Sequence, residues 1–395
     1  MSRTKQGNEY IRSGEPCFDP FEFRFLDVLS KKNDVTVAFF TPSGRISREN
    51  RIAPDNALLV PLRDFPLLRY LPLPLRLLIE TLTCILRIAL LVRILRPDMV
   101  VGNWITRLSG LCCAFVGFHP FLAIAWGDDV LIEPKRSRFM RVLARFTLRV
   151  ADAVIVDSQV QRSAVLDLGC KPSKIYCFPW GIDLDKFRPG KPTQIRRDLG
   201  WLNQKIVIST RKHYPIYGIE YLIRAIPTIT RLVKDTKFVL VGDGPCLSYH
   251  KSLTRQLRIE RQVKFLGSVR NDLLPDILNA ADVYVSTSFS DGSSASLMEA
   301  MACGLPIVVT SIPGNKEWVN NGQNGFLVPP ADSLALARSV ARILQDDTLR
   351  LLMKRANLEL AKRRADWRVN STVLEQCVSD LFFSKRETEN ARTRR

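Results

Sequence analysis

The sequence predicts an α/β protein with two doubly wound domains. The chain has 395 residues, enough for two full hydrophobic cores, and 46% of them are apolar. Short β-branched runs alternate with helical patterns along its length, as expected for parallel sheets covered by helices. A polar stretch containing proline and glycine, Pro189 to Pro192, separates two halves of similar pattern and is the natural linker.

The first half begins weakly and then settles into regular strands. Met1 to Glu15 is polar, so no signal peptide is expected, and Glu9 to Ser13 is too weakly apolar for the usual first strand, which we expect to be degenerate or missing. Phe21 to Phe40 fits the helix and strand that normally follow. Charges and prolines interrupt Leu67 to Leu95, so we favour an amphipathic helix packed on a sheet over an interfacial membrane helix. The predicted strands are Val35 to Phe40, Met99 to Asn103, Leu122 to Trp126, Ala153 to Asp157 and Ile175 to Phe178.

The second half repeats this alternation. We expect a first domain at residues 1–188, a second at 189–365, a terminal helix at 366–384 and a charged, disordered tail at 385–395. Ligands of doubly wound sheets bind at the carboxyl ends of the strands, which predicts a site in a cleft between the domains. The predicted strands are Lys205 to Thr210, Phe238 to Gly242, Val263 to Gly267, Val283 to Thr287, Ile307 to Thr310 and Gly325 to Val328.

The composition points to an anionic partner and away from metal chemistry. The net charge of +19 fits a nucleic acid, an anionic membrane surface or phosphorylated substrates, and does not choose among them. Nine cysteines occur without a Cys-x-x-Cys pair, so neither a disulfide framework nor a zinc site is indicated, and a reducing cytosol fits best. The three histidines are widely scattered in the sequence, and we predict no bound metal.

The most informative segment is Asp291 to Pro306, which places one glutamate among small and apolar residues directly after a polar turn. Ser293 and Ser294 are suited to cap a helix whose first amides bind phosphate without any cationic side chain. Glu299 then lies about one turn inside the helix. Burying a carboxylate there is costly unless donors are supplied, and the paired hydroxyls of a ribose supply two.

This segment resembles the donor-binding signature of a known enzyme family. An isolated glutamate is normally a surface residue, but the neighbours of Glu299 are those of the retaining glycosyltransferases of family four. In that signature an acid, seven intervening residues and a glutamate precede Ala-Met-Ala-x-Gly-x-Pro, and Asp291 stands here where the acid is usually Glu. The resemblance covers about Phe21 to Phe383. It implies the GT-B fold, two Rossmann-like domains facing a central cleft, with a terminal helix that crosses back to the N-terminal domain.

The same resemblance implies a donor site in the second domain. Arg211 is implied to stabilise the leaving diphosphate, and Lys212 is a candidate second cation because Tyr217 replaces the lysine that the family usually has before Gly218. Glu299 is implied to hold the ribose and Asp291 to orient the sugar. The other implied donor-binding residues are Gly242 and Gly244 after one strand, Gly267 and Val269 near the nucleobase, and Ser294, Ala295, Ser296 and Leu297 at the start of the helix.

In the first domain the segment Ala125 to Asp129 stands where many relatives have His-Gly-x-Asp. Trp126 replaces the histidine that contacts the donor sugar, so that contact is not carried over. Asp129 matches the acid of the pattern. We consider it a helper at the catalytic centre or, with equal weight, a helix cap. Asn103 and Trp104, at the end of another strand, are candidates to hold the acceptor.

A row of arginines marks one helix of the first domain. Arg138, Arg141, Arg145 and Arg149 follow one another at spacings of three, four and four, and Lys135 and Arg136 precede them. A solvated helix face is the ordinary explanation for such a row. An anionic surface explains it equally well, because each cation gains roughly 1 kcal/mol near an anionic leaflet.

Together these observations predict a retaining, metal-independent glycosyltransferase. It is expected to move a sugar from a nucleotide diphosphate sugar to a glycan or lipid-linked acceptor in cell-surface polysaccharide or glycolipid synthesis. We expect it in the cytoplasm, peripheral at the inner face of the plasma membrane. The alternative is a catalytically impaired GT-B protein that binds nucleotide sugar or a partner at the membrane, motivated by Asp291, Tyr217 and Trp126. Nucleic-acid binding is disfavoured because no aromatic and basic platform is present.

Overall fold

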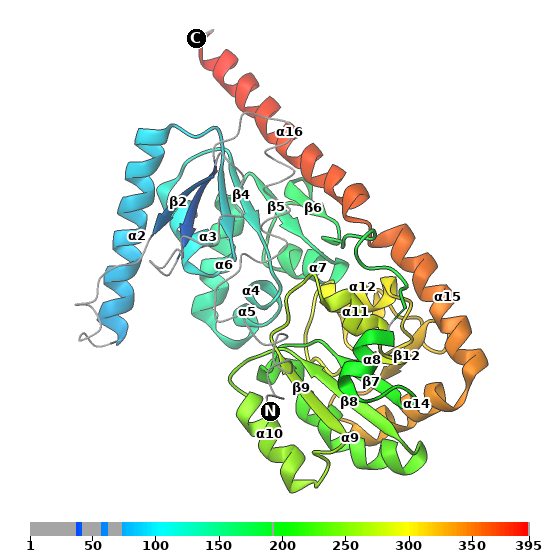
Figure 1. The fold of residues 1–395 in the computed structure, drawn as a ribbon. Helices are drawn as coiled ribbons and strands as arrows, with labels where there is room; N and C mark the ends of the chain where they lie inside the picture. Colours follow the sequence, from blue (N-terminus) through cyan, green and yellow to red (C-terminus); the bar gives the residue numbers. More distant parts are fainter. Residues whose placement is uncertain (1–36, 42–56, 62–72, 192, 394–395) are drawn as a thin grey trace, which may run out of the picture. The chain divides into compact units, whose positions relative to one another are not determined.

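Two compact units make up the protein. The computed structural model describes residues 37–41, 57–61, 73–191 and 193–393 (Figure 1). The C-terminal unit runs from Pro179 to Asn370, and the N-terminal unit ends at Phe178 and resumes at Ser371. The units thus divide before the predicted boundary at Arg188. The intervening loop belongs to the C-terminal unit because Ile182 N donates to Ala365 O at 2.7 Å and Phe187 is buried in that unit's core.

The C-terminal unit is built on a six-stranded parallel sheet. The strand order is β12-β11-β10-β7-β8-β9, so the order reverses between β7 and β10. The strands are short, β-branched and buried on both faces, which is why their sequences are nearly continuous apolar runs. All six were predicted from the sequence. They are β7 (Lys205–Ser209), β8 (Thr236–Val241), β9 (Val263–Gly267), β10 (Val283–Ser286), β11 (Ile307–Thr310) and β12 (Gly325–Val328).

Helices cover both faces of this sheet. Alternate strand residues face two separate cores: Ile206 and Ile208 pack with α12, whereas Val207 packs with α9 and α14. This two-sided burial confirms the doubly wound prediction. The helices are α8 (Thr193–Leu199), η3 (Pro215–Tyr217), α9 (Ile219–Leu232), α10 (Leu247–Gln256), α11 (Leu274–Asn279), α12 (Ala295–Ala302), α13 (Pro313–Lys316), α14 (Ser333–Gln345) and α15 (Asp347–Arg364).

The N-terminal unit carries a four-stranded parallel sheet in the order β3-β4-β5-β6. Its strands β3 (Val100–Asn103), β4 (Phe121–Ile124), β5 (Ala153–Val156) and β6 (Ile175–Cys177) match the predicted ones. A separate parallel pair joins β1 (Val37–Thr41) to β2 (Ala57–Pro61). β2 was not predicted, because this short run ends in proline and resembles a loop. The weak first strand at Glu9 to Ser13 lies outside the described residues.

The helices of the N-terminal unit include the most apolar segment of the chain. In α2, Cys84 and Ile88 are buried in the core of this unit, as expected for an amphipathic helix that packs on its neighbours. Among the described helices, none is long and apolar enough to span a membrane. The helices are α2 (Leu73–Leu95), α3 (Leu108–Val116), α4 (Asp128–Leu131), α5 (Glu133–Arg136), α6 (Arg138–Val150), α7 (Gln159–Asp167) and η2 (Pro172–Lys174).

The terminal helix α16 (Trp367–Thr393) begins in the C-terminal unit and continues into the N-terminal one. Tyr176, the middle residue of β6, donates to the Asp380 carboxylate on this helix at 2.6 Å. The disordered tail predicted at residues 385–395 is wrong as far as Thr393, because the helix continues to that residue. Its lysine, arginine and glutamate residues are good helix formers, so high charge did not prevent helix formation here.

Candidate functional site

The predicted donor residues of the C-terminal unit gather where the strand order reverses. Arg211 follows β7, and residues 287–294 connect β10 to α12. β7 and β10 are neighbours in the sheet, although two strands, β8 and β9, lie between them along the chain. In open parallel sheets this reversal leaves a crevice at the carboxyl ends of the strands, where ligands bind.

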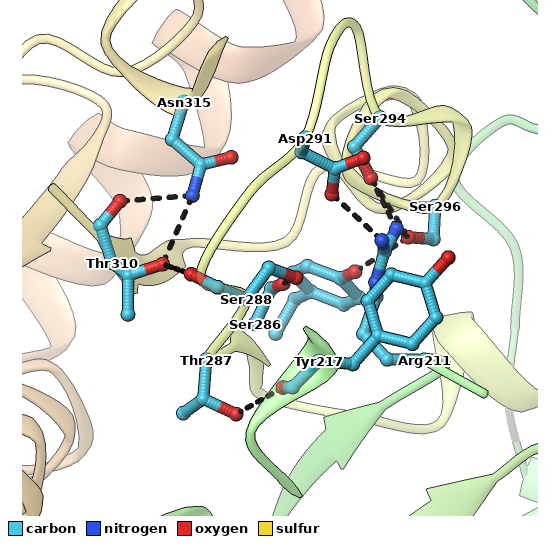
Figure 2. Close-up of polar contacts among 11 residues, drawn as sticks. Arg211, Tyr217, Ser286, Thr287, Ser288, Asp291, Ser294, Ser296, Thr310 and Asn315 are labelled. Atoms are coloured by element: carbon cyan, nitrogen blue, oxygen red, sulfur yellow. Dashed lines mark hydrogen bonds and ion pairs between the residues drawn. The ribbon is translucent and has the colours of Figure 1, made fainter. Parts of the chain in front are cut away.

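At the centre of this region Arg211 holds the start of α12 (Figure 2). One terminal nitrogen, Nη1, donates to the hydroxyls of Ser294 at 2.6 Å and Ser296 at 2.8 Å. The other, Nη2, lies 2.7 Å from the Asp291 carboxylate. The guanidinium also stacks on the Tyr217 ring, 4.0 Å from its centroid. The structure thus brings four of the predicted site residues into one network.

The charges of this network are buried and therefore poorly solvated. Only 8% of Arg211 is exposed. Burial opposes its charge, but the negative charges of Asp291 and Glu299 and the two tyrosines Tyr217 and Tyr284 outweigh this, so the pKa of Arg211 lies above its ordinary value. Burial also raises the pKa of Asp291, although Arg211 and nearby serine hydroxyls counteract it. The two charges therefore depend on each other.

The helix start differs from the prediction in how its serines are used. Ser294 occupies the N-cap position of α12, but its side chain makes no capping hydrogen bond and instead accepts from Arg211. The Ser293 hydroxyl accepts from Trp318 Nε1 at 3.2 Å. The prediction that the Ser294 side chain caps the helix is therefore wrong. Because the Ser294 side chain accepts from Arg211, it does not accept hydrogen bonds from the first backbone amides of α12.

The rest of α12 places one acidic side chain within an apolar helix. Leu297 is 1% exposed and packs in the core, so only its backbone is available to a ligand, and Ala295 has no polar side chain. Glu299 follows one turn later and is 9% exposed. Gly304 closes the helix in the left-handed conformation, with φ of 78°.

Hydroxyl groups surround the end of β10, and sequence reasoning missed them. Tyr284 donates to Ser296 Oγ at 2.9 Å, and the hydroxyls of Ser286 and Ser288 lie 3.0 Å apart. Thr287 donates to Tyr217 O at 2.9 Å, as Figure 2 shows. The run of hydroxyl residues at a strand end was visible in the sequence, but the strand's neighbour in the sheet was not.

The predicted glycines serve the close approach of neighbouring loops. A side chain at Gly242 would meet Arg211 O at 2.7 Å, and one at Gly244 would meet His213 O at 2.6 Å. Gly242 N donates to Gly267 O at 2.7 Å, which joins the ends of β8 and β9. Val269 packs against the core. Lys212, by contrast, is exposed and is not part of the Arg211 network.

Two histidines that are far apart in the sequence meet beside the Arg211 loop. His213 Nδ1 and His250 Nδ1 lie 2.7 Å apart, and both side chains are buried. The pKa of His213 is lowered to about 4, mainly by burial and also by the proximity of His250 and Lys251, whereas Asp243 raises it. Burial also lowers the pKa of His250 against the effect of Glu220. A neutral pair therefore ties the loop after β7 to α10.

Asp129 lies in the N-terminal unit and is fully buried. One carboxylate oxygen accepts from Ile105 N at 2.8 Å, and the other accepts from Trp126 N at 3.1 Å and Gly127 N at 2.9 Å. Its pKa is raised to about 6, because the effect of burial outweighs that of these three amides, which lower it. These contacts give Asp129 a structural role, because its oxygens bind backbone amides of two loops, and its role as a catalytic helper stays a prediction.

Two family models match segments of the chain that contain the loops described above. Residues 203–346 match the family model described as "Glycosyl transferases group 1". Residues 62–158 match a second model, described as "Glycosyl transferase 4-like". The first match contains the Arg211 network and the second contains the Asp129 loops.

Two curated relatives illustrate the similarity. A UDP-Gal:alpha-D-GlcNAc-diphosphoundecaprenol alpha-1,3-galactosyltransferase of Escherichia coli is 27% identical, over 65% of this chain and 66% of its own length. A GDP-mannose-dependent alpha-(1-6)-phosphatidylinositol monomannoside mannosyltransferase of Mycolicibacterium smegmatis is 27% identical, over 61% of this chain and 64% of its own. The matches thus span less than two thirds of these relatives.

A solved structure shares the fold over nearly the whole chain. HepE of Anabaena, in complex with UDP and glucose, superimposes with a TM-score of 0.75 at 21% identity, covering 93% of this chain and 98% of that one. At this identity the similarity concerns the fold alone, and it confirms the predicted two-domain architecture.

The buried ion pair generates a prediction about stability. Arg211→Met should lower the free energy of unfolding by about 3–5 kcal/mol, because it leaves the Asp291 carboxylate buried without its cation. Adding Asp291→Asn to that variant should recover part of the loss, with a coupling energy of at least about 1 kcal/mol in a double-mutant cycle by urea denaturation. As a control, Arg270→Met removes an exposed pair and should change little. If the changes in the free energy of unfolding of the two single variants simply added in the double variant, the coupling would be contradicted.

The histidine pair generates a prediction about pH. Between pH values of about 6.5 and 4 an unfolded imidazole binds a proton that buried His213 does not, so stability is retained above this range and falls as the pH decreases through it. Lowering the pH from about 7.5 to about 5 should cost about 2 kcal/mol in urea denaturation. His213→Phe should flatten this dependence, whereas His119→Gln, at an exposed histidine, should not. An equal slope in wild type and His213→Phe would refute the assignment.

Proposed function

Because the chain belongs to the group 1, family-four-like glycosyltransferases with the GT-B fold, we propose that it transfers a sugar from a nucleoside diphosphate sugar to a glycan or lipid-linked acceptor. The observation that carries this proposal is the Arg211 network at the strand-order reversal. It joins a buried cation, an acidic residue of the loop before α12 and the start of that helix, which are groups suited to bind a nucleotide sugar.

The donor is proposed to bind with its diphosphate at the N-terminus of α12. The amides of residues 294–297 and the positive end of the helix dipole stabilise phosphate oxygens. Arg211 lies beside the same turn, and its charge adds to theirs. Its Nε is buried without a hydrogen-bond partner among the described residues, which favours an incoming acceptor atom such as a phosphate oxygen.

The remaining donor contacts follow from position. Glu299, one turn into α12, is proposed to accept hydrogen bonds from the ribose hydroxyls. Asp291, in the loop before α12, is proposed to orient the transferred sugar while paired with Arg211. Gly267 and Val269 at the end of β9 are proposed to receive the nucleobase through their backbone.

The proposed reaction proceeds with retention and without a metal. The bond from the anomeric carbon to the phosphate oxygen breaks, and the negative charge that develops on the diphosphate is stabilised by Arg211 and the helix amides. An acceptor hydroxyl then attacks the resulting oxocarbenium-like centre on the face that the diphosphate leaves, and the hydroxyl proton passes to an oxygen of the departing diphosphate. Departure of the diphosphate is thus assisted by groups of the C-terminal unit alone.

The acceptor is proposed to be presented at an anionic membrane surface. Both curated relatives are named for acceptors with a lipid part. Six cations of α5 and α6 are exposed, and none forms an ion pair within the described chain; they are Lys135, Arg136, Arg138, Arg141, Arg145 and Arg149. Phe139 and Val142 are 66% and 63% exposed beside them. Apolar and cationic side chains on one helix suit the interface of an anionic leaflet at the inner face of the plasma membrane.

A second candidate is a binding protein without turnover. Tyr217 stands where the family usually has a lysine, and its ring packs on Arg211 in place of a second cation. This arrangement would weaken stabilisation of the leaving group while leaving the ribose and phosphate contacts intact. Slow hydrolysis of the donor in the absence of acceptor distinguishes the enzyme from this alternative.

The donor proposal is tested with Glu299→Gln. This isosteric change removes a charge-assisted acceptor of the ribose hydroxyls and should weaken binding of the donor by at least about tenfold. Saturation-transfer NMR against UDP- and GDP-sugars measures it. Glu260→Gln, at an exposed glutamate of the same unit, is the matched control and should bind as the wild type does. The site would be rejected if Glu299→Gln bound the donor as tightly as the wild type does, or if the wild type bound no donor.

The membrane proposal is tested with α6. Replacing Arg138, Arg141, Arg145 and Arg149 with Gln should reduce co-sedimentation with vesicles of phosphatidylglycerol and phosphatidylcholine by at least about tenfold, because each cation contributes about 1 kcal/mol. Salt should reduce wild-type binding in the same way. The control removes four exposed cations of the C-terminal unit: Arg255, Arg258, Arg261 and Lys264. Equal losses in the two variants would show a general charge effect and reject α6 as the docking face.

A further inference from the structure

The N-terminal unit presents two tryptophans at the carboxyl ends of neighbouring strands. Trp104 follows β3 and Trp126 follows β4, and these strands pair directly. Their ring centroids lie 6.0 Å apart with an interplanar angle of 32°. Both residues are partly exposed, whereas their neighbours Ile105 and Ala125 are fully buried. Two large aromatic rings therefore remain partly exposed next to fully buried apolar residues.

The backbone at Trp104 is held in an unfavourable conformation. Its φ is 65°, in the left-handed region that a bulky side chain rarely adopts. Trp104 N donates to Ile124 O at 3.0 Å, and Trp104 O accepts from Arg107 N at 3.1 Å. Gly110 permits the turn, since a side chain there would meet Trp104 O at 2.4 Å. Such strain persists where the fold requires a particular side-chain position, and it is concentrated at functional sites.

A buried carboxylate fixes the two tryptophan loops to each other. Asp129 binds Ile105 N in the loop after β3 and Trp126 N and Gly127 N in the loop after β4. Trp126 Nε1 also donates to Asn103 Oδ1 at 3.3 Å, which links the indole of one loop to the side chain of the other. The relative position of the two rings is therefore set by polar contacts rather than by packing alone.

The rim of the pair is polar and rich in acceptors. The guanidinium of Arg107 stacks on Trp104 at 3.8 Å and pairs with Asp128 and Glu133. These three side chains are part-exposed, and the two carboxylates exceed the one cation. An excess of negative charge disfavours a phosphorylated ligand. Carboxylate and amide oxygens are instead suited to accept hydrogen bonds from hydroxyl groups.

We propose that Trp104 and Trp126 form a binding site for a neutral pyranose ring of the acceptor. The C–H face of a pyranose carries partial positive charge and is attracted to the negative face of an indole, and its hydroxyls reach the polar rim. The inference rests on the proposed function, because it names the part of the acceptor that this unit recognises. It adds a sugar-binding pair to the donor site of the C-terminal unit.

Trp104→Gly separates binding from stability. Glycine adopts positive φ without strain, so the relief of backbone strain offsets part of the ring contacts that this variant removes, and its thermal midpoint should stay close to that of the wild type. Arg258→Gly is the matched control: Arg258 also has positive φ, 55°, is exposed, and lies in the C-terminal unit. Trp104→Phe keeps an aromatic face and should retain part of the affinity.

The probes are octyl glycosides of glucose, galactose, mannose and N-acetylglucosamine, titrated by saturation-transfer NMR. The wild type and Arg258→Gly should bind at least one of them equally, and Trp104→Gly should bind it about tenfold more weakly, with Trp104→Phe between them. Unchanged binding by Trp104→Gly, or no binding of any glycoside by the wild type, would overturn the inference. Hydrolysis of UDP- and GDP-sugars, measured on the wild type and on the control Arg258→Gly, should be equal. Its absence in the wild type would instead count against the proposed enzyme.

Discussion

The buried ion pair between Arg211 and Asp291 is the interaction on which the candidate donor site depends. Arg211 follows β7 and Asp291 follows β10, and the pair joins these two loops at the reversal of strand order. Removing either partner leaves a charge in a poorly solvated place, so the pair stabilises one loop arrangement over others. Since Nη1 also holds Ser294 and Ser296, the same cation positions the first turn of α12. Structural stability and the proposed binding of phosphate therefore share one residue.

The N-terminal unit also buries a charged side chain, but this side chain is acidic. Asp129 is buried, yet it accepts three backbone hydrogen bonds and so remains compatible with its surroundings. In both units a charged side chain joins loops that follow neighbouring parallel strands. The difference is that Arg211 is surrounded by hydroxyls and a carboxylate, whereas Asp129 is satisfied by amides alone. This is why only the first is proposed to act on a substrate.

Sequence patterns predicted most strands and the central helix because these depend on local properties. β7 to β12 are short β-branched runs, and α12 has small residues and a closing glycine, Gly304. β2 was missed because its five residues carry no distinctive pattern. The tail was misjudged because charge density alone does not distinguish a solvated helix from a disordered chain. The three amide contacts of Asp129 were not foreseen, because a motif match does not reveal which atoms bind its oxygens.

The sequence by itself determined the fold class, the succession of strands along the chain and the identity of Arg211, Asp291 and Glu299 as candidate site residues. Their spacing and neighbours are properties of the chain and need no coordinates. Only the tertiary structure decided that Arg211 pairs with Asp291, that His213 meets His250, and that Trp104 lies beside Trp126. Each of these contacts joins loops from different strands. Which loops become neighbours follows from the strand order in the sheet, and this order is set by packing of the whole unit rather than by any local segment.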